Sequence, residues 1–156
     1  MTKDNAVVEL EARLDGVLAA LLAASHGSRV TLRIDDPDRG WNVDFICAEA
    51  TAPGVKSLRG DGSIDQWAAA TVVWMDKQRR NLIQPDLTGN PDPAPPPALM
   101  SAYAAKAQML APLVNRSGKL QGWVSVHYVG STHAFTDAEI AALDKAAADV
   151  KSLTGI

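Results

Sequence analysis

Cysteine is nearly absent from this chain, and positive charge is not in excess. The only cysteine among the 156 residues is Cys47, which excludes an intramolecular disulfide and any metal site built from cysteines alone. There are 15 lysines and arginines against 18 aspartates and glutamates, so the net charge is −3. Proteins that bind nucleic acid carry basic patches that neutralise phosphates. We therefore expect no nucleic-acid partner.

Long hydrophobic runs are missing as well. The N-terminal region interrupts its apolar residues with Glu9, Glu11, Arg13 and Asp15, which fits neither a signal peptide nor a membrane span. We therefore expect a cytoplasmic protein with no membrane partner. The apolar fraction of 47% and the charged fraction of 21% are those of an ordinary globular protein. The length fits one domain over residues 1–156.

An amphipathic helix is predicted over residues 5–24. Apolar side chains recur there at spacings of three and four, which places them on one face of a helix. Leu18 and Leu22 widen this stripe and are expected to leave apolar surface beyond what the sheet covers. Such surface is suited to a protein partner.

A second amphipathic helix is predicted over residues 137–153. Thr136 and Glu139 have the spacing of a capping box, in which each side chain accepts a backbone N–H that the first turn leaves unpaired. Phe135 and Ile140 have the spacing of the matching hydrophobic staple. The start of this helix is therefore expected at a defined residue.

Alternating apolar and polar side chains predict strands between these helices, because successive side chains of a strand point to opposite faces. The predicted strands are residues 29–35, 41–48, 81–84, 103–113 and 120–129. Residues 64–77 are predicted to be helical, and residues 51–63 and the proline-rich residues 86–98 to be loops. This order predicts an α+β fold, an antiparallel central sheet of about five to six strands with both terminal helices on one face.

The segment from Lys106 to Ile140 resembles a known family. The residues that carry the resemblance are Lys106, Ala107, Pro112-Leu113, Gly118, Gly122-Trp-Val-Ser-Val126 and Phe135-Thr-Asp-Ala-Glu139. Their order is similar to the end of a GAF domain, a small-molecule-binding sensor module. Ala107 stands where that family frequently has serine, and Lys106 where arginine is usual. The cyclic-nucleotide signature of some members is absent, as is a phytochrome-like chromophore cysteine pattern around Cys47.

The resemblance implies a ligand pocket on the face of the sheet opposite the terminal helices. It also implies a homodimer, because GAF domains often dimerise by bundling those helices. Strand alternation places polar and aromatic side chains on the pocket face, and the central helix would close the site from above. The candidate ligand-binding residues are Thr31, Arg33, Trp67, Trp74, Met75, Lys106, Gln108, Trp123, Ser125 and His127.

Two of these candidates indicate what the pocket could recognise. Arg33 supplies a planar fork for a carboxylate or phosphate, and His127 supplies a hydrogen-bond donor or acceptor. The competing interpretation is that such charges are solvated and that the four tryptophans are ordinary core. No cofactor is expected. No metal is expected either, because His26, His127 and His133 lack the spacing of metal ligands.

The sequence therefore predicts a sensor or carrier domain that binds a small organic ligand of unknown identity. Catalysis is not expected, and the domain would act through a partner protein or as a homodimer. Two alternatives remain open. The first is a cofactor-free enzyme, or an accessory component of a catabolic pathway, with His127 as acid or base near Arg33. The second is an interaction module whose pocket has collapsed around the tryptophans.

Overall fold

The computed structural model describes residues 4–156. Four α-helices, two short 3₁₀ helices and five strands follow one another along this part of the chain. They are α1 (Asn5–Ser25), β1 (Arg29–Ile34), η1 (Pro37–Arg39), β2 (Ala48–Thr51), η2 (Gln66–Ala68), α2 (Ala70–Gln78), β3 (Leu82–Gln84), α3 (Pro97–Ser101), β4 (Ala105–Val114), β5 (Leu120–Val129) and α4 (Asp137–Thr154).

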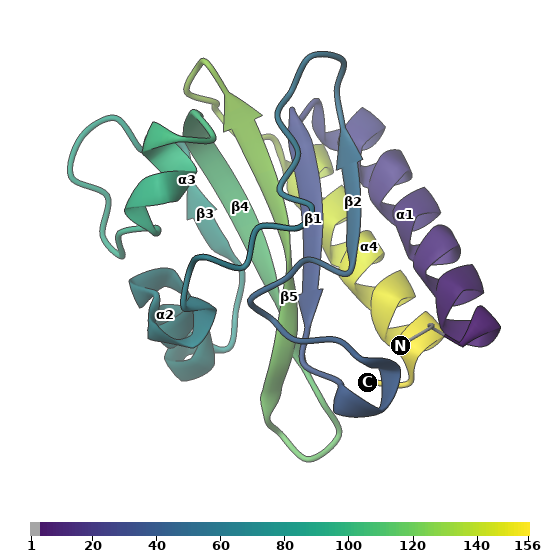
Figure 1. Ribbon diagram of the computed structural model, residues 1–156. Coiled ribbons are helices and arrows are strands. Elements are labelled where there is room, and N and C mark those ends of the chain that lie inside the picture. Colours follow the sequence, from purple (N-terminus) through teal and green to yellow (C-terminus); the bar gives the residue numbers. More distant parts are fainter. Residues whose placement is uncertain (1–3) are drawn as a thin grey trace.

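The strands form one antiparallel sheet in the order β2-β1-β5-β4-β3. Helices α1 and α4 lie side by side on one face of this sheet, and α2 and α3 lie on the other side (Figure 1). The predicted α+β fold is thereby confirmed. No helix within residues 4–156 has the length and hydrophobicity needed to cross a membrane.

The larger hydrophobic core fills the space between the sheet and the two terminal helices. Leu14, Leu18 and Leu21 of α1 are buried there against side chains of the sheet such as Leu32 and Val126. Burying a leucine side chain stabilises a fold by about 1.5–3 kcal/mol. Leu18 was expected to leave apolar surface for a partner, and that expectation is wrong. It is 0% exposed, because it belongs to the core that α1 forms with the sheet and with α4.

The prediction of a strand over residues 41–48 is also wrong. Trp41 pairs only with Asp36 in an isolated bridge, and the following residues turn, with the Phe45 N–H donating to the Asn42 carbonyl. On this side β1 pairs with β2, which begins at Ala48, the last residue of the predicted strand, and ends at Thr51, the first residue of the predicted loop. Hydrogen bonds within the Asn42 turn replace the ladder bonds that alternation alone predicted.

The predicted helix over residues 64–77 is divided in two. Ala69 has an extended backbone, with φ −66° and ψ 135°, which separates η2 from α2. The Gln66 N–H donates to the Asp44 carboxylate instead of entering a longer helix. The predicted short strand at 81–84 and the strand at 120–129 are confirmed as β3 and β5.

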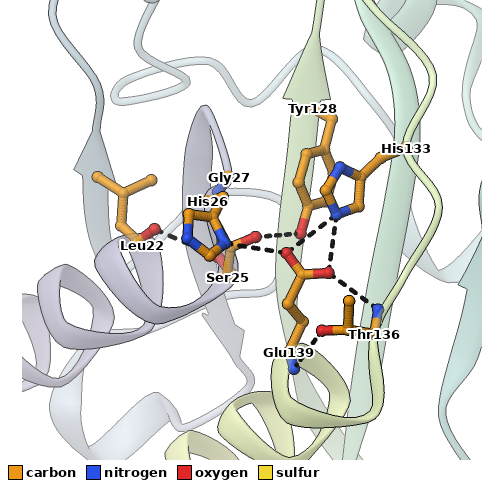
Figure 2. A network of polar contacts seen from close by, with 8 residues as sticks. All are labelled: Leu22, Ser25, His26, Gly27, Tyr128, His133, Thr136 and Glu139. Atoms are coloured by element: carbon orange, nitrogen blue, oxygen red, sulfur yellow. Dashed lines mark hydrogen bonds and ion pairs between the residues drawn. The ribbon is translucent and has the colours of Figure 1, made fainter.

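The capping box at the start of α4 is confirmed. The Glu139 N–H donates to the Thr136 hydroxyl, and the Thr136 N–H donates to the Glu139 carboxylate at 2.9 Å. Glu139 is almost fully buried and has two further neighbours, His133 Nε2 at 2.9 Å and His26 Nδ1 at 3.2 Å (Figure 2). Because His26 ends α1, the carboxylate joins the end of one terminal helix to the start of the other.

Strand β5 also contacts the region where α1 ends and α4 begins. The Tyr128 hydroxyl donates to the Ser25 carbonyl in the last turn of α1, at 2.7 Å (Figure 2). The Tyr128 ring stacks on His133, with ring centroids 4.0 Å apart, and meets Phe135 edge-on. The two terminal helices and β5 therefore meet in one polar network centred on the buried Glu139, and Tyr128 in this network is the residue that follows His127, a predicted site residue.

Candidate functional site

A small cavity lies on the face of the sheet that α1 and α4 leave free. Alternate side chains of β1, β4 and β5 form one wall, and η2, α2, α3 and the segments before η2 and α3 form the rest. Its volume is about 30 Å³. A water molecule needs about 10–15 Å³ of such space, so two or three water-sized groups fit. The lining residues are Thr31, Arg33, Leu58, Ile64, Gln66, Thr71, Val72, Pro96, Leu99, Gln108, Leu110, Trp123, Ser125 and His127.

Strand pairing brings the predicted strand residues to this cavity. Thr31 lies opposite Ser125, and Arg33 lies opposite Trp123 across the β1–β5 pair. Gln108 lies opposite His127 across the β4–β5 pair, so three neighbouring strands contribute to the same wall. The six side chains share a face because each strand alternates. The candidates that line the cavity are Thr31, Arg33, Gln108, Trp123, Ser125 and His127.

The other four candidates lie elsewhere. Trp74 and Met75 pack in a second hydrophobic cluster beside the cavity. Trp67 is 38% exposed and meets Trp123 edge-on, with ring centroids 5.6 Å apart. Lys106 is exposed, because a register shift between Ala105 and Ala107 turns its side chain away from the cavity wall. Trp41, the fourth tryptophan, belongs to the helix-side core.

Arg29 is a buried residue that the sequence reasoning did not select. Its Nε donates to His127 Nδ1 at 3.0 Å, and its two Nη groups donate to the Lys56 and Tyr103 carbonyls. Burial lowers the pKa of Arg29, while the Glu49 carboxylate opposes that shift. Its position beside Thr31 and Arg33 in strict alternation was the available signal.

The bond from Arg29 determines the protonation of His127. Arginine can only donate, so His127 Nδ1 must accept, and the neutral ring then carries its proton on Nε2. Burial is the main reason that the pKa of His127 lies well below its ordinary value, and the charges of Arg29 and Arg33 lower it further. The ring is therefore neutral at pH 7. Nε2–H can donate a hydrogen bond but has no lone pair with which to act as a base.

Arg33 is the only charged side chain among the lining residues. It is 5% exposed, and its Nη1 donates to the Val43 carbonyl at 2.8 Å. Burial lowers the pKa of Arg33 to about 10, even though Asp44 and Asp61 favour the charged form. The guanidinium is therefore still charged at neutral pH.

Several lining side chains have no hydrogen-bond partner within residues 4–156. They are the Thr31, Thr71 and Ser125 hydroxyls and the Gln66 amide, all on buried residues. No fully enclosed side-chain nitrogen or oxygen in that part of the chain lacks a partner, so these atoms keep access to the cavity. Gln66 and Thr71 were missed by the sequence reasoning, because η2 and α2 approach the sheet only through tertiary packing.

Gln108 is held by a chain of amides. Its Nε2 donates to Gln84 Oε1 at 2.7 Å, and the Gln84 amide donates to the Pro93 carbonyl at 2.7 Å. This chain connects the proline-rich segment to β3 and β4. The Gln108 carbonyl oxygen has no protein donor within residues 4–156. The Gln108 side chain is thus held in position by Gln84 of β3, at the edge of the sheet, and its carbonyl oxygen remains available as a hydrogen-bond acceptor in the cavity wall.

No protein-family model matches the chain, and no curated protein matches it. Similar solved structures include the blue-light-absorbing form of the PixJ GAF domain of Thermosynechococcus elongatus (16% identity, 99% of this chain and 92% of that chain, TM-score 0.70). GAF3 from Slr1393 of Synechocystis sp. PCC6803 is 15% identical over 90% of each chain, with a TM-score of 0.67. The far-red-absorbing JSC1_58120g3 with bound biliverdin IXa is 15% identical over 96% of this chain and 97% of that chain, with a TM-score of 0.64.

The chain has the GAF fold. The superposition covers nearly the whole of both chains, so the resemblance first carried by Lys106 to Ile140 extends to the complete sheet and both terminal helices. At 16% identity the likeness concerns the fold.

The GAF cavity of this chain does not fit a bilin. Pockets for organic molecules of drug size occupy about 300–1,000 Å³, roughly ten times the space present here. The only thiol, that of Cys47, lies in the helix-side core near the Leu32 carbonyl, on the opposite side of the sheet from the cavity. No group of three or more His, Cys, Asp or Glu side chains within residues 4–156 is placed to hold a metal ion.

Proposed function

We propose that this GAF-fold protein is a sensor or carrier domain that binds a small organic molecule in the cavity between β1, β4, β5 and α2. One observation carries the proposal. Buried polar side chains from three strands and two helices converge on one space, and several have no protein partner. A hydrogen bond contributes about 0.5–1.5 kcal/mol net, so a bound molecule that pairs several of these groups stabilises the fold.

Strand β5 would transmit the effect of ligand binding from the cavity to the terminal helices. His127 lines the cavity, and the next residue, Tyr128, contacts α1 and the His133–Glu139 network on the opposite face. A ligand that moves β5 therefore changes the joint between α1 and α4. We propose that this protein acts in the cytoplasm and passes such a change to a partner protein or to a second copy of itself.

The homodimer is proposed through α1 and α4. A shallow groove between them is lined by Val17, Ala20, Leu21, Ala142 and Ala146, with Lys145 and Asp149 beside it. Small side chains allow a helix of a second copy to approach closely, and α1 and α4 already pack against each other. Light scattering should give twice the chain mass of 16.5 kDa. A solution mass near 16.5 kDa across the micromolar range contradicts the dimer.

Ligand binding is tested by thermal shift of the purified protein against a library of small acids, amides, alcohols and heterocycles. A ligand at 100 times its Kd stabilises the native state by about 2.7 kcal/mol. The stabilisation should disappear in Ser125→Leu, which fills the cavity, and persist in Ser117→Leu, which alters an exposed turn. Stabilisation that survives Ser125→Leu would place the ligand elsewhere, and a library without any stabiliser would refute the proposal.

The small volume of the cavity favours a second candidate, an interaction module with a collapsed pocket. Trp123 is buried and fills space beside the cavity, with Trp67 against its edge. In that case the filled variant Ser125→Leu should match the wild type in every property, including partner binding. A partner that binds the wild type but not the filled variant favours the sensor.

A further inference from the structure

The walls of the cavity carry positive charge but no negative charge. Within residues 4–156, Arg33 is the only charged group on its walls, and no aspartate or glutamate lines it. The two nearest acids are engaged elsewhere. The Asp44 carboxylate accepts from the Gln66 N–H, and the Asp61 carboxylate accepts from Ser63 and from the Tyr103 hydroxyl. Neither carboxylate lies within 4.0 Å of the Arg33 guanidinium, so neither forms an ion pair with it.

A buried guanidinium without a carboxylate partner is an unusual arrangement, because burying a charge is costly unless it is paired. Arg33 has five N–H groups, of which one donates to a protein acceptor, the Val43 carbonyl. The remaining N–H groups have no acceptor within residues 4–156. An anion in the cavity would supply both the missing charge and the missing acceptors.

The neighbours of Arg33 on this wall also donate. Thr31 lies two residues away on β1, and Ser125 lies opposite Thr31 on β5; both hydroxyls are free to donate. His127 Nε2–H is the third donor, since Arg29 occupies Nδ1. A carboxylate only accepts hydrogen bonds, at about four lone-pair sites on two oxygens. The donors around Arg33 therefore match an ionised carboxylate, whereas the N–H groups of an amide or an ammonium group could not pair with Arg33 or with His127 Nε2–H, which only donate.

The size and the other walls limit the remainder of the ligand. Two or three water-sized groups fill about 30 Å³, which is about the size of the carboxylate group itself, so only a short alkyl tail can accompany it. Val72, Leu99 and Leu110 supply apolar walls where a short alkyl group would be removed from water.

We infer that the cavity binds the carboxylate of a short-chain organic acid, held by the Arg33 guanidinium and by the hydrogen-bond donors of Thr31, Ser125 and His127. The inference rests on the proposed function and names the ligand class for that same cavity. It makes Arg33 the main determinant of affinity and the short alkyl tail the limit on size.

The test uses isothermal titration and thermal shift of the full chain with acetate, propionate and butyrate. Acetamide, propionamide and butyramide are the neutral matches, and sodium chloride keeps the ionic strength constant. The acids should bind at one site per chain, and the amides should bind at least tenfold more weakly. Arg33→Gln should weaken the acids at least tenfold, and Arg116→Gln, which removes an exposed arginine of the β4–β5 turn, should leave them unchanged.

The comparison of acids with amides on the wild type decides the matter even if Arg33→Gln does not fold. Equal binding of the two series overturns the carboxylate inference and leaves the proposed function standing. Tighter binding of inorganic phosphate or sulfate than of any carboxylate also overturns it. If the acids fail while a neutral molecule stabilises the protein through the cavity, the inference alone is refuted. If nothing stabilises it, the proposed function fails as well.

Discussion

Replacing Glu139 by glutamine tests the network that joins α1, β5 and α4. The side chain is 5% exposed and lies within hydrogen-bond distance of Thr136 N, His133 Nε2 and His26 Nδ1. Burial by itself would raise the pKa of this carboxyl group. The hydrogen bonds from Thr136, His133 and His26 outweigh burial and lower the pKa from 4.5 to about 2.

The shift sets the magnitude and the sign of the effect. At about 1.4 kcal/mol per pKa unit, ionised Glu139 adds about 3 kcal/mol to stability relative to the protonated form. Because the folded pKa is the lower one, this stabilisation is present above pH 4.5 and is lost as the pH falls towards 2. We expect Glu139→Gln to lower the free energy of unfolding by about 2–3 kcal/mol at pH 7, since glutamine keeps part of the capping box. The Tm should fall by about 5–10 °C.

The assay is urea unfolding followed by circular dichroism at pH 7.0 and again between pH 4.5 and pH 3. Glu9→Gln, which changes an exposed glutamate of α1, is the matched control and should stay within about 0.5 kcal/mol of the wild type. The difference between Glu139→Gln and wild type should shrink on acidification. A variant within 0.5 kcal/mol of the wild type at pH 7, or a difference independent of pH, would refute the reasoning.

Urea unfolding also measures four further effects. Gly122→Ala should cost about 3 kcal/mol or prevent folding, because its Cβ would lie 2.2 Å from a β1 carbonyl oxygen. Gly16→Ala in α1 meets no atom within 4 Å and should stabilise by about 0.5–1 kcal/mol. Leu18→Ala should lower the free energy of unfolding by about 2–5 kcal/mol. Val8 is 50% exposed, so Val8→Ala should change it by at most about 0.5 kcal/mol. Tyr128→Phe, which loses a buried hydrogen bond, should cost about 1 kcal/mol. An opposite sign or ranking contradicts the packing described.

The elements predicted correctly are those whose signals are local. The start of α4 follows from Thr136 and Glu139, three residues apart, and the box forms wherever that segment folds. The face of β5 follows from alternation over ten residues, which also places Ser125 and His127 together. These features need no knowledge of the rest of the chain.

The errors arose where distant packing competes with a local pattern. Residues 41–48 alternate like a strand, but hydrogen bonds in the Asn42 turn and the pairing of β1 with Ala48–Thr51 replaced that strand. Strand alternation predicted that the Lys106 side chain faces the cavity, but a register shift beside this residue turns the side chain outward. Trp74 and Met75 pack in a hydrophobic cluster beside the cavity and do not line the cavity itself.

The amino-acid sequence by itself determined the two terminal helices, the long strands and the faces they present, because capping and alternation act between residues a few positions apart. Tertiary structure alone decided the chemistry of the cavity. Arg29 and His127 are 98 positions apart, and only the β1–β5 register brings them within 3.0 Å. That hydrogen bond occupies the lone pair of His127 Nδ1 and leaves Nε2–H as the donor of the ring. Whether Arg33 has a carboxylate partner likewise depends on where the loops carrying Asp44 and Asp61 come to rest, which no local pattern encodes.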